Sequence, residues 1–219
     1  MNHILKTFLL GLTLLIVPGT TALAQHATPY LTINGGAALS NDMSLEDSAG
    51  HYAAEFDTGY SWGGAIGLDL GHSYPQIGTG RIELELTDRV LPLKNASFTT
   101  GSDPGDGDLE TISIMFNTIA EYAKTSHYGT PYLGLGLGAA QVSLLETTVA
   151  ELPMIDDDTI TFAYQFFTGT TLSLGKRFEL DLRYRFFSTL DPKLTDALGR
   201  NVETDLGIHD LTVGLRLSF

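Results

Sequence analysis

The chain ends in the stretch Asp210-Leu-Thr-Val-Gly-Leu-Arg-Leu-Ser-Phe219, in which every second residue is apolar. Neighbouring side chains of a β-strand point to opposite faces, so this alternation predicts a strand with one apolar face and one polar or small face. The apolar face comprises Leu211, Val213, Leu215, Leu217 and Phe219. We therefore expect a fold built from strands of this kind, the last of which stops on an aromatic residue.

Seven further segments upstream have the same strand character, which makes eight in total. The eight segments span residues 29–39, 59–71, 80–90, 109–123, 130–145, 161–174, 177–187 and 209–219. Each lies near the ~9–11 residues that a tilted transmembrane strand needs. This pattern indicates an all-β chain that forms one domain.

The links between these segments alternate between long and short. The long ones are polar and acidic, at 40–58, 91–108, 146–160 and 188–208, and the short ones lie at 72–79, 124–129 and 175–176. Long loops on one rim and tight turns on the other are typical of an outer-membrane barrel. The sequence therefore predicts an eight-stranded antiparallel up-and-down transmembrane β-barrel.

The first 24 residues have the three parts of a secretory signal peptide. Lys6 supplies the positive charge, residues 8–17 form an apolar stretch, and Ala22 and Ala24 give a small-x-small cleavage site before Gln25. We expect residues 1–24 to be removed and residues 25–219 to form the barrel domain. Beyond Ala24 no apolar run approaches the ~18 residues of a transmembrane helix, which leaves an exported soluble β-protein or a closed membrane barrel.

Composition narrows the chemistry. The chain has no cysteine, so neither a disulfide framework nor thiolate chemistry is expected. Its formal net charge of −14 disfavours nucleic acid as a partner. Stability must then come from the strand ladder and from packing.

The charged residues follow the same alternation. In the segment 177–187, Glu179, Asp181, Arg183 and Arg185 share one face and the large apolar residues share the other. A soluble barrel turns the apolar face inward, whereas a membrane barrel turns it toward lipid. Aromatic residues near both ends of the segments indicate two water–lipid interfaces, so we expect the charges to face the lumen.

Several stretches resemble a known family. The pattern Thr212-x-Gly214-x-x-Leu217-x-Phe219 resembles the C-terminal assembly signal of Gram-negative outer-membrane barrels, which the barrel assembly machinery reads. With Gly59 to Leu70, Arg81 to Leu86, Pro131 to Gly138, Phe162 to Gln165 and Leu180 to Phe186, the chain resembles the eight-stranded family of opacity proteins and OmpA-type transmembrane domains.

The resemblance implies an outer-membrane surface protein of a Gram-negative cell. Its expected partners are membrane lipid, lipopolysaccharide, the assembly machinery and a host or environmental ligand that contacts the loops. The family implies no enzymatic activity and no cofactor. Because the chain ends at its barrel, we expect no periplasmic peptidoglycan-binding domain.

A barrel of this size is filled by side chains, so its buried charges should form ion pairs. Strands four apart face each other, which predicts pairs of Arg81 with Glu179 and of Glu85 with Arg183 or Arg185. Around the wall, Asp69 should lie near Arg81, and Glu121 near Arg216. The expected lumen network comprises Asp69, Arg81, Glu83, Glu85, Glu121, Glu179, Asp181, Arg183, Arg185 and Arg216.

This network has two interpretations: ion pairs that fix the barrel, or the gate of a narrow channel for ions or small solutes. Asp88 has outward parity, and we expect it at the outer interface, where a charge costs little. The acidic loops could gather divalent cations or simply remain soluble; no specific metal site is predicted.

No catalytic set is apparent in the sequence. Gly134-x-Gly136-x-x-Ala139 matches a dinucleotide fingerprint but lies inside a strand with no following helix. The hypotheses are a surface barrel that displays acidic loops for adhesion, interaction or envelope integrity, a narrow channel, a lipid-modifying or proteolytic barrel, and a soluble ligand-binding barrel. The first is preferred.

Overall fold

The computed structural model describes residues 27–40, 43–47, 50–71, 79–98, 101–122, 129–149, 152–190, 193–195, 201–204 and 206–219. Within these ranges all regular elements are β-strands. No helix among the described residues is long and apolar enough to span a membrane. The expected signal peptide, with Ala22 and Ala24, lies outside the described residues.

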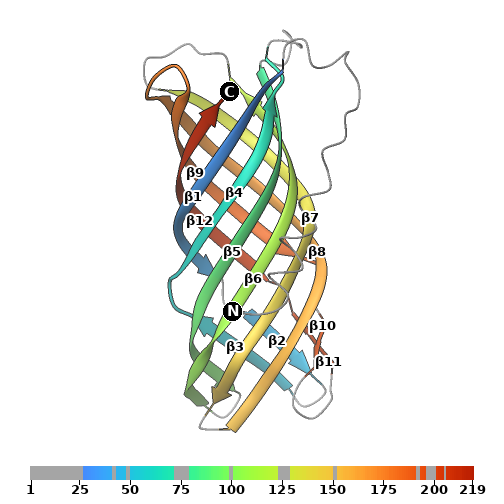
Figure 1. Cartoon of the computed structure of the whole chain (residues 1–219). Coiled ribbons are helices and arrows are strands. Elements are labelled where there is room, and N and C mark those ends of the chain that lie inside the picture. Colours follow the sequence, from blue (N-terminus) through green and yellow to red (C-terminus); the bar gives the residue numbers. More distant parts are fainter. Residues whose placement is uncertain are drawn as a thin grey trace.

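Eight strands form a closed antiparallel barrel, which confirms the expected architecture (Figure 1). Each of the eight wall strands pairs with the wall strand that follows it in the sequence. The last wall strand pairs with the first, so that Tyr30 lies opposite Ser218 and the barrel is closed. The wall consists of β1 (Thr28–Ser40), β4 (Gly59–Asp69), β5 (Thr79–Phe98), β6 (Gly101–Glu121), β7 (Thr130–Val149), β8 (Leu152–Ser173), β9 (Phe178–Thr189) and β12 (Gly207–Ser218).

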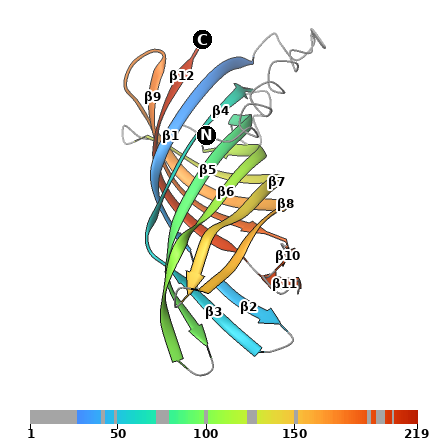
Figure 2. The ribbon, with the colours of Figure 1, turned by 60° about the horizontal axis from the view of Figure 1, so that its bottom comes forward.

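Four shorter strands continue this wall at the end that carries the long hairpins. They are β2 (Met43–Asp47), β3 (Gly50–Phe56), β10 (Lys193–Thr195) and β11 (Asn201–Thr204). β3 pairs with the far part of β5, β2 pairs with β3, and β11 joins β2 to β10 (Figure 2). We call this the hairpin end, and the opposite rim the turn end.

The expectation of long loops at the hairpin end was wrong for most of their length. Residues 91–108 belong largely to β5 and β6, and residues 146–160 largely to β7 and β8. β5 is 20 residues long and β8 is 22, about twice the ~9–11 residues that a tilted strand needs to cross a bilayer. The barrel therefore projects well beyond a membrane on this side.

At the turn end the connection between β8 and β9 is described in full. Gly71 and Gly129 have φ angles of 57° and 114°, a region in which a residue with a Cβ is strained. Between β8 and β9 the backbone N–H of Leu174 donates to the carbonyl of Phe178 over 2.9 Å. This turn matches the short link expected at residues 175–176, whereas most of the links expected at 72–79 and 124–129 lies outside the described residues.

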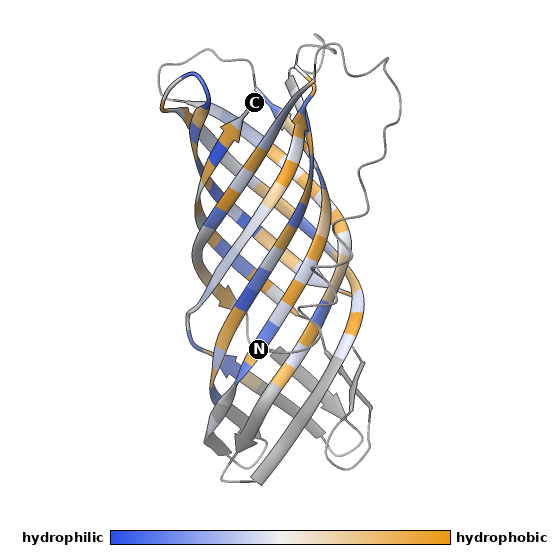
Figure 3. Ribbon diagram, viewed as in Figure 1, coloured by the Kyte–Doolittle hydropathy of each residue, from blue (hydrophilic) through white to orange (hydrophobic). Residues whose placement is uncertain are grey.

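Around the middle of the wall, apolar and polar residues alternate along each strand as they do in a membrane barrel (Figure 3). Ile33 is 60% exposed and Leu135 54%, whereas Arg81 is 1% exposed and Glu85 is fully buried. Apolar side chains thus face outward and ionised ones inward, as the sequence predicted. A membrane supplies the apolar surroundings that the outer face needs.

Closer to the hairpin end the same strands reverse this pattern. Inward-facing Leu91 and Leu109 are fully buried, whereas Lys94 and Asp108, which face outward, are exposed. We call the buried side chains at the centre of this region the apolar plug: Leu91, Leu109, Phe187, Leu206 and Ile208. The projecting part of the wall therefore has the arrangement of a soluble barrel, with apolar side chains inside and polar ones outside.

Glycines on β7 make room for large side chains from its neighbours. A Cβ on Gly134 would lie 2.2 Å from the ring of Phe167 on β8. A Cβ on Gly136 would lie 2.1 Å from Oδ1 of Asn117 on β6. These glycines face inward, and the space beside them is filled by side chains from both adjacent strands.

Candidate functional site: the lumen network and the apolar plug

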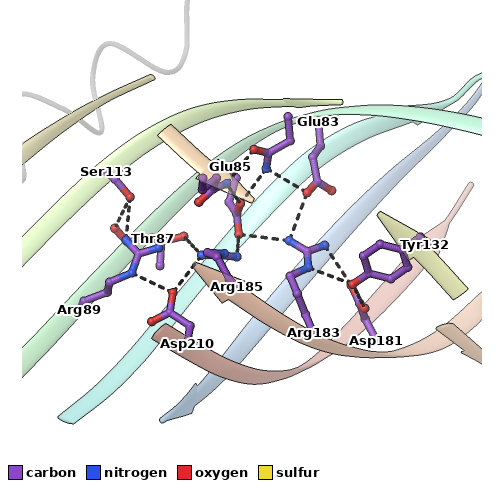
Figure 4. Close-up of polar contacts among 12 residues, drawn as sticks. Glu83, Glu85, Thr87, Arg89, Ser113, Tyr132, Asp181, Arg183, Arg185 and Asp210 are labelled. Atoms are coloured by element: carbon purple, nitrogen blue, oxygen red, sulfur yellow. Dashed lines mark hydrogen bonds and ion pairs between the residues drawn. The ribbon is translucent and has the colours of Figure 1, made fainter. Parts of the chain in front are cut away.

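Arg183 lies at the centre of the lumen network (Figure 4). From β9 its guanidinium reaches Glu83 at 3.3 Å and Glu85 at 3.5 Å, both on β5. It also contacts Asp181, two residues away on its own strand, at 3.0 Å. β5 and β9 are the third and seventh strands of the wall, so the contact crosses the lumen between opposite strands.

Arg185 continues the network toward the hairpin end. It lies 2.5 Å from Glu85 and 3.5 Å from Asp210 on β12. Asp210 also pairs with Arg89 at 2.9 Å, and all four side chains are fully buried. Figure 4 shows the resulting chain of charges from Asp181 to Arg89.

A second group of charges lies at the turn end. Glu121 contacts Arg81 at 2.9 Å and Arg216 at 3.6 Å. Arg216 also pairs with Glu179, which faces it directly in the β9–β12 register. Asp69 lies opposite Arg81 in the β4–β5 register.

Of the expected pairings, Glu85 with Arg183 and Arg185, and Glu121 with Arg216, are present. The pairing of Arg81 with Glu179 was wrong, because each finds a partner elsewhere: Arg81 pairs with Glu121 and Glu179 with Arg216. Opposite strands do not stand at equal depth in a staggered barrel. Partners at the same depth on other strands are nearer.

Neutral donors supplement the arginines. Glu83 accepts hydrogen bonds from the Tyr30 hydroxyl at 3.0 Å and from Asn117 at 3.1 Å. Asp181 accepts one from the Tyr132 hydroxyl at 2.5 Å. Hydrogen bonds that a buried carboxylate accepts from the protein offset part of the hydration energy that it loses on burial. Neutral donors therefore help to hold the carboxylates of the network.

Glu85 receives the same support from two amides. Nδ2 of Asn117 donates to it at 2.7 Å and Nε2 of Gln165 at 3.1 Å. The sequence reasoning missed these amides, together with Tyr30, Tyr132, Arg89 and Asp210. Their inward parity was the available signal. The expected network contained charged residues alone, and it left out Arg89 and Asp210 although they share the parity of Glu85 and Arg216.

Aromatic rings flank the guanidinium groups. The guanidinium carbon of Arg183 lies 4.7 Å from the ring centre of Phe167, and that of Arg89 lies 4.2 Å from the ring centre of Phe187. A cation over an aromatic face gains electrostatic stabilisation. Phe187 thus touches the last arginine of the network on one side and belongs to the apolar plug on the other.

The apolar plug lies beyond Arg89, toward the hairpin end. Each of its five side chains is at most 1% exposed. Apolar packing of this kind leaves no polar partner for an ion or for water. The ionic lumen therefore ends against a hydrocarbon layer at the hairpin end.

On the outer surface, Asp88 faces outward as its parity predicted. Nε1 of Trp62 donates to its carboxylate at 3.0 Å. Trp62 is the single tryptophan of the chain and is 59% exposed. Amphipathic aromatic residues prefer the headgroup level of a bilayer, so this pair marks one boundary of the membrane.

The residues of the expected assembly signal lie at the end of the wall. Thr212 and Gly214 lie on the inner face of β12, and Phe219 follows the strand, 68% exposed, with its N–H bonded to the carbonyl of Pro29 at 3.0 Å. Leu217 pairs with Leu31. In the part of the chain whose side chains are described, no group of three or more His, Cys, Asp or Glu could hold a metal ion.

A family model for the outer membrane protein beta-barrel domain matches residues 7–219. The chain belongs to this family. Membership places this outer-membrane barrel in the outer membrane of Gram-negative cells, so the turn end faces the periplasm and the hairpin end the outside. No curated protein sequence matches the chain.

Solved structures similar to this outer-membrane barrel include Neisserial surface protein A (NspA), with 16% identity and a TM-score of 0.50 over 88% of this chain and 99% of that one. OprG from Pseudomonas aeruginosa is 12% identical, with a TM-score of 0.46 over 88% and 97%. The outer membrane protease OmpT from Escherichia coli is 10% identical, with a TM-score of 0.49 over 88% and 97%. The likeness to NspA supports the fold alone.

Proposed function

We propose that this barrel is a non-enzymatic surface protein that presents its projecting outer wall to a host or environmental ligand. The observation that carries the proposal is the apolar plug, a cluster of buried side chains toward the outer end of the lumen, and we infer that it closes the lumen. A barrel with a sealed lumen does not conduct ions or solutes, so its function should depend on its outer surface.

The plug argues against a channel. A conducting pore needs a continuous polar path or a constriction that can wet, and narrow apolar constrictions hold back ions by dewetting. Three side chains of the plug are fully buried and belong to one apolar cluster: Leu91, Leu109 and Ile208. The ion pairs below them then fix the barrel rather than gate it.

The outer end supplies a surface suited to recognition. Segments 41–58, 91–110, 143–160 and 190–206 contain 18 of the 26 acidic residues of the chain and 3 of its 12 basic residues. Much of this region is strand rather than loop. Ordered strands lose less conformational entropy on binding than flexible loops do. The ligand that suits this surface carries positive charge, and lipopolysaccharide bridged by divalent cations surrounds its base.

The absence of catalysis is part of the proposal. In the network the carboxylates contact arginines or neutral donors, so none is held as an acid or base facing a substrate. Incubating the purified barrel with lipopolysaccharide or with labelled peptides should leave acyl chains and peptide bonds intact. Cleavage of either would replace the proposal with an enzymatic function.

Planar-bilayer recordings test the sealed lumen. Wild type, Glu85→Gln and Arg183→Gln should all lack unitary conductance, because the plug is intact in each. A double variant, Leu91→Ser with Leu109→Ser, removes two plug side chains and should admit ions. If wild type conducts and Glu85→Gln changes its conductance, the narrow-channel alternative is correct.

Export and assembly complete the proposal. We expect signal peptidase to cleave after Ala24, so that N-terminal sequencing of the outer-membrane protein begins at Gln25. The terminal pattern from Thr212 to Phe219 should be read by the barrel assembly machinery. Deleting Phe219 should lower the amount of heat-modifiable barrel in the outer membrane, and normal levels would remove the assembly role.

A further inference from the structure

The turn between β8 and β9 carries two adjacent cations. Residues 173–178 are all exposed, and the turn projects from the periplasmic rim (Figures 1 and 3). Its tip carries Lys176 and Arg177 side by side. The opposite end of the barrel is strongly acidic. The two cations of the turn therefore lie at the other end of the molecule, on the periplasmic side of the membrane.

Two large apolar side chains flank these cations. Leu174 is 61% exposed and Phe178 is 47% exposed. Phe178 pairs with Leu217 and begins the lipid-facing alternation of β9, whereas the hydrogen bond from Leu174 to Phe178 holds the two flanks together. The turn thus combines an apolar base at the membrane boundary with a cationic tip.

This combination fits one environment. Aromatic and aliphatic side chains settle at the boundary of the acyl region, and Lys or Arg side chains extend from there to the headgroups. Anionic headgroups attract such cations. We propose that the β8–β9 turn binds the phosphate groups of anionic phospholipids in the periplasmic leaflet.

The observations favour lipid over the cell wall. Peptidoglycan lies in water beyond the membrane and offers nothing for Leu174 and Phe178 to contact. Lipopolysaccharide occupies the other leaflet. A phospholipid supplies both a phosphate for the cations and an acyl chain for the apolar flanks.

The test uses the mature barrel in nanodiscs that contain phosphatidylcholine and phosphatidylglycerol in equal amounts. Native mass spectrometry then measures which lipids stay bound. Wild type should retain phosphatidylglycerol preferentially. Lys176→Gln with Arg177→Gln should lower the preference by about fivefold for each cation removed. Lys94→Gln, a matched loss of an exposed cation at the outer end, should leave it unchanged.

Further arms separate the possible sources of the effect. High salt should weaken the preference of wild type, because exposed charges are screened, and heat-modifiable gel mobility should show that all variants are folded. An equal preference in wild type and the double variant overturns the proposal. So does loss of peptidoglycan pull-down in the double variant with no change in bound lipid, which would assign the turn to the wall polymer.

Discussion

Arg89 and Leu91 lie two residues apart on the same inward face of β5, and the interior of the barrel changes from ionic to apolar between them. Arg89 pairs with Asp210 at 2.9 Å, whereas Leu91 is fully buried in the apolar plug. The change follows the surroundings of the wall. Lipid outside requires apolar side chains on the outer face, and water outside permits polar ones, so the inner face can become a hydrophobic core.

Replacing Arg183 by methionine should strongly destabilise the barrel. Glu83, Glu85 and Asp181 would lose their shared cation, and breaking a buried ion pair from one side costs about 3–5 kcal/mol. Urea unfolding in lipid vesicles, followed by the fluorescence of Trp62, measures the change. Lys94→Met removes the exposed pair with Asp57 and should cost less than about 1 kcal/mol. Equal losses for the two variants would contradict a stabilising role of the network.

Arg89 and Asp210 should behave as a coupled pair. Arg89→Leu or Asp210→Leu alone leaves a buried charge without its main partner and should destabilise the barrel. Replacing both by leucine should recover most of the loss, because apolar side chains often substitute well for a buried pair. Arg185 contacts Glu85 at 2.5 Å, so it should keep a partner in the double variant.

A double-mutant cycle on the free energy of unfolding measures this coupling. We expect an interaction energy of roughly 0.5–3 kcal/mol, as for other residues in contact. Additive effects of the two single changes would show that the pair contributes nothing as a unit.

Replacing Gly136 by leucine should prevent correct packing of the lumen. The new Cβ would meet Asn117 at 2.1 Å and Gln165 at 2.8 Å, the two amides that donate to Glu85. Loss of the heat-modifiable band on gels and of assembled barrel in membranes is the expected result. Gly175→Ala is the matched control, because nothing lies within 4 Å of its added Cβ. A folded Gly136→Leu barrel of normal stability would contradict the close packing.

Replacing Leu135 by arginine tests which face of β7 meets lipid. Leu135 lies in the middle of the outward row and is 54% exposed, so a cation there should cost about 2–4 kcal/mol. Pro131→Arg, at the periplasmic end of the same row, should cost roughly 0–1 kcal/mol. Unfolding in vesicles compares the two, and indistinguishable values would mean that Leu135 does not face hydrocarbon.

The local pattern was enough to find the strands and their inner faces. Arg81 and Glu85 have the same parity, as do Arg183 and Arg185, and a period of two places each pair on one face whatever the partner strand is. The inward direction followed from the aromatic ends and the terminal Phe219. Leu91 has the same parity, yet the sequence assigned it to the link 91–108, because acidic and turn-forming residues nearby resembled a connection. Leu109 begins the expected strand 109–123, but its place in an apolar cluster was not predicted.

The sequence by itself determined the number of wall strands, their order and the inner and outer faces of the eight expected segments, because these depend on local alternation. Only the tertiary structure decided that Arg81 pairs with Glu121 rather than Glu179, that Asn117 and Gln165 support Glu85, and that Phe187 and Ile208 meet in a plug. These contacts join strands far apart in the chain. Their depth depends on the stagger of the closed barrel, which no single strand encodes.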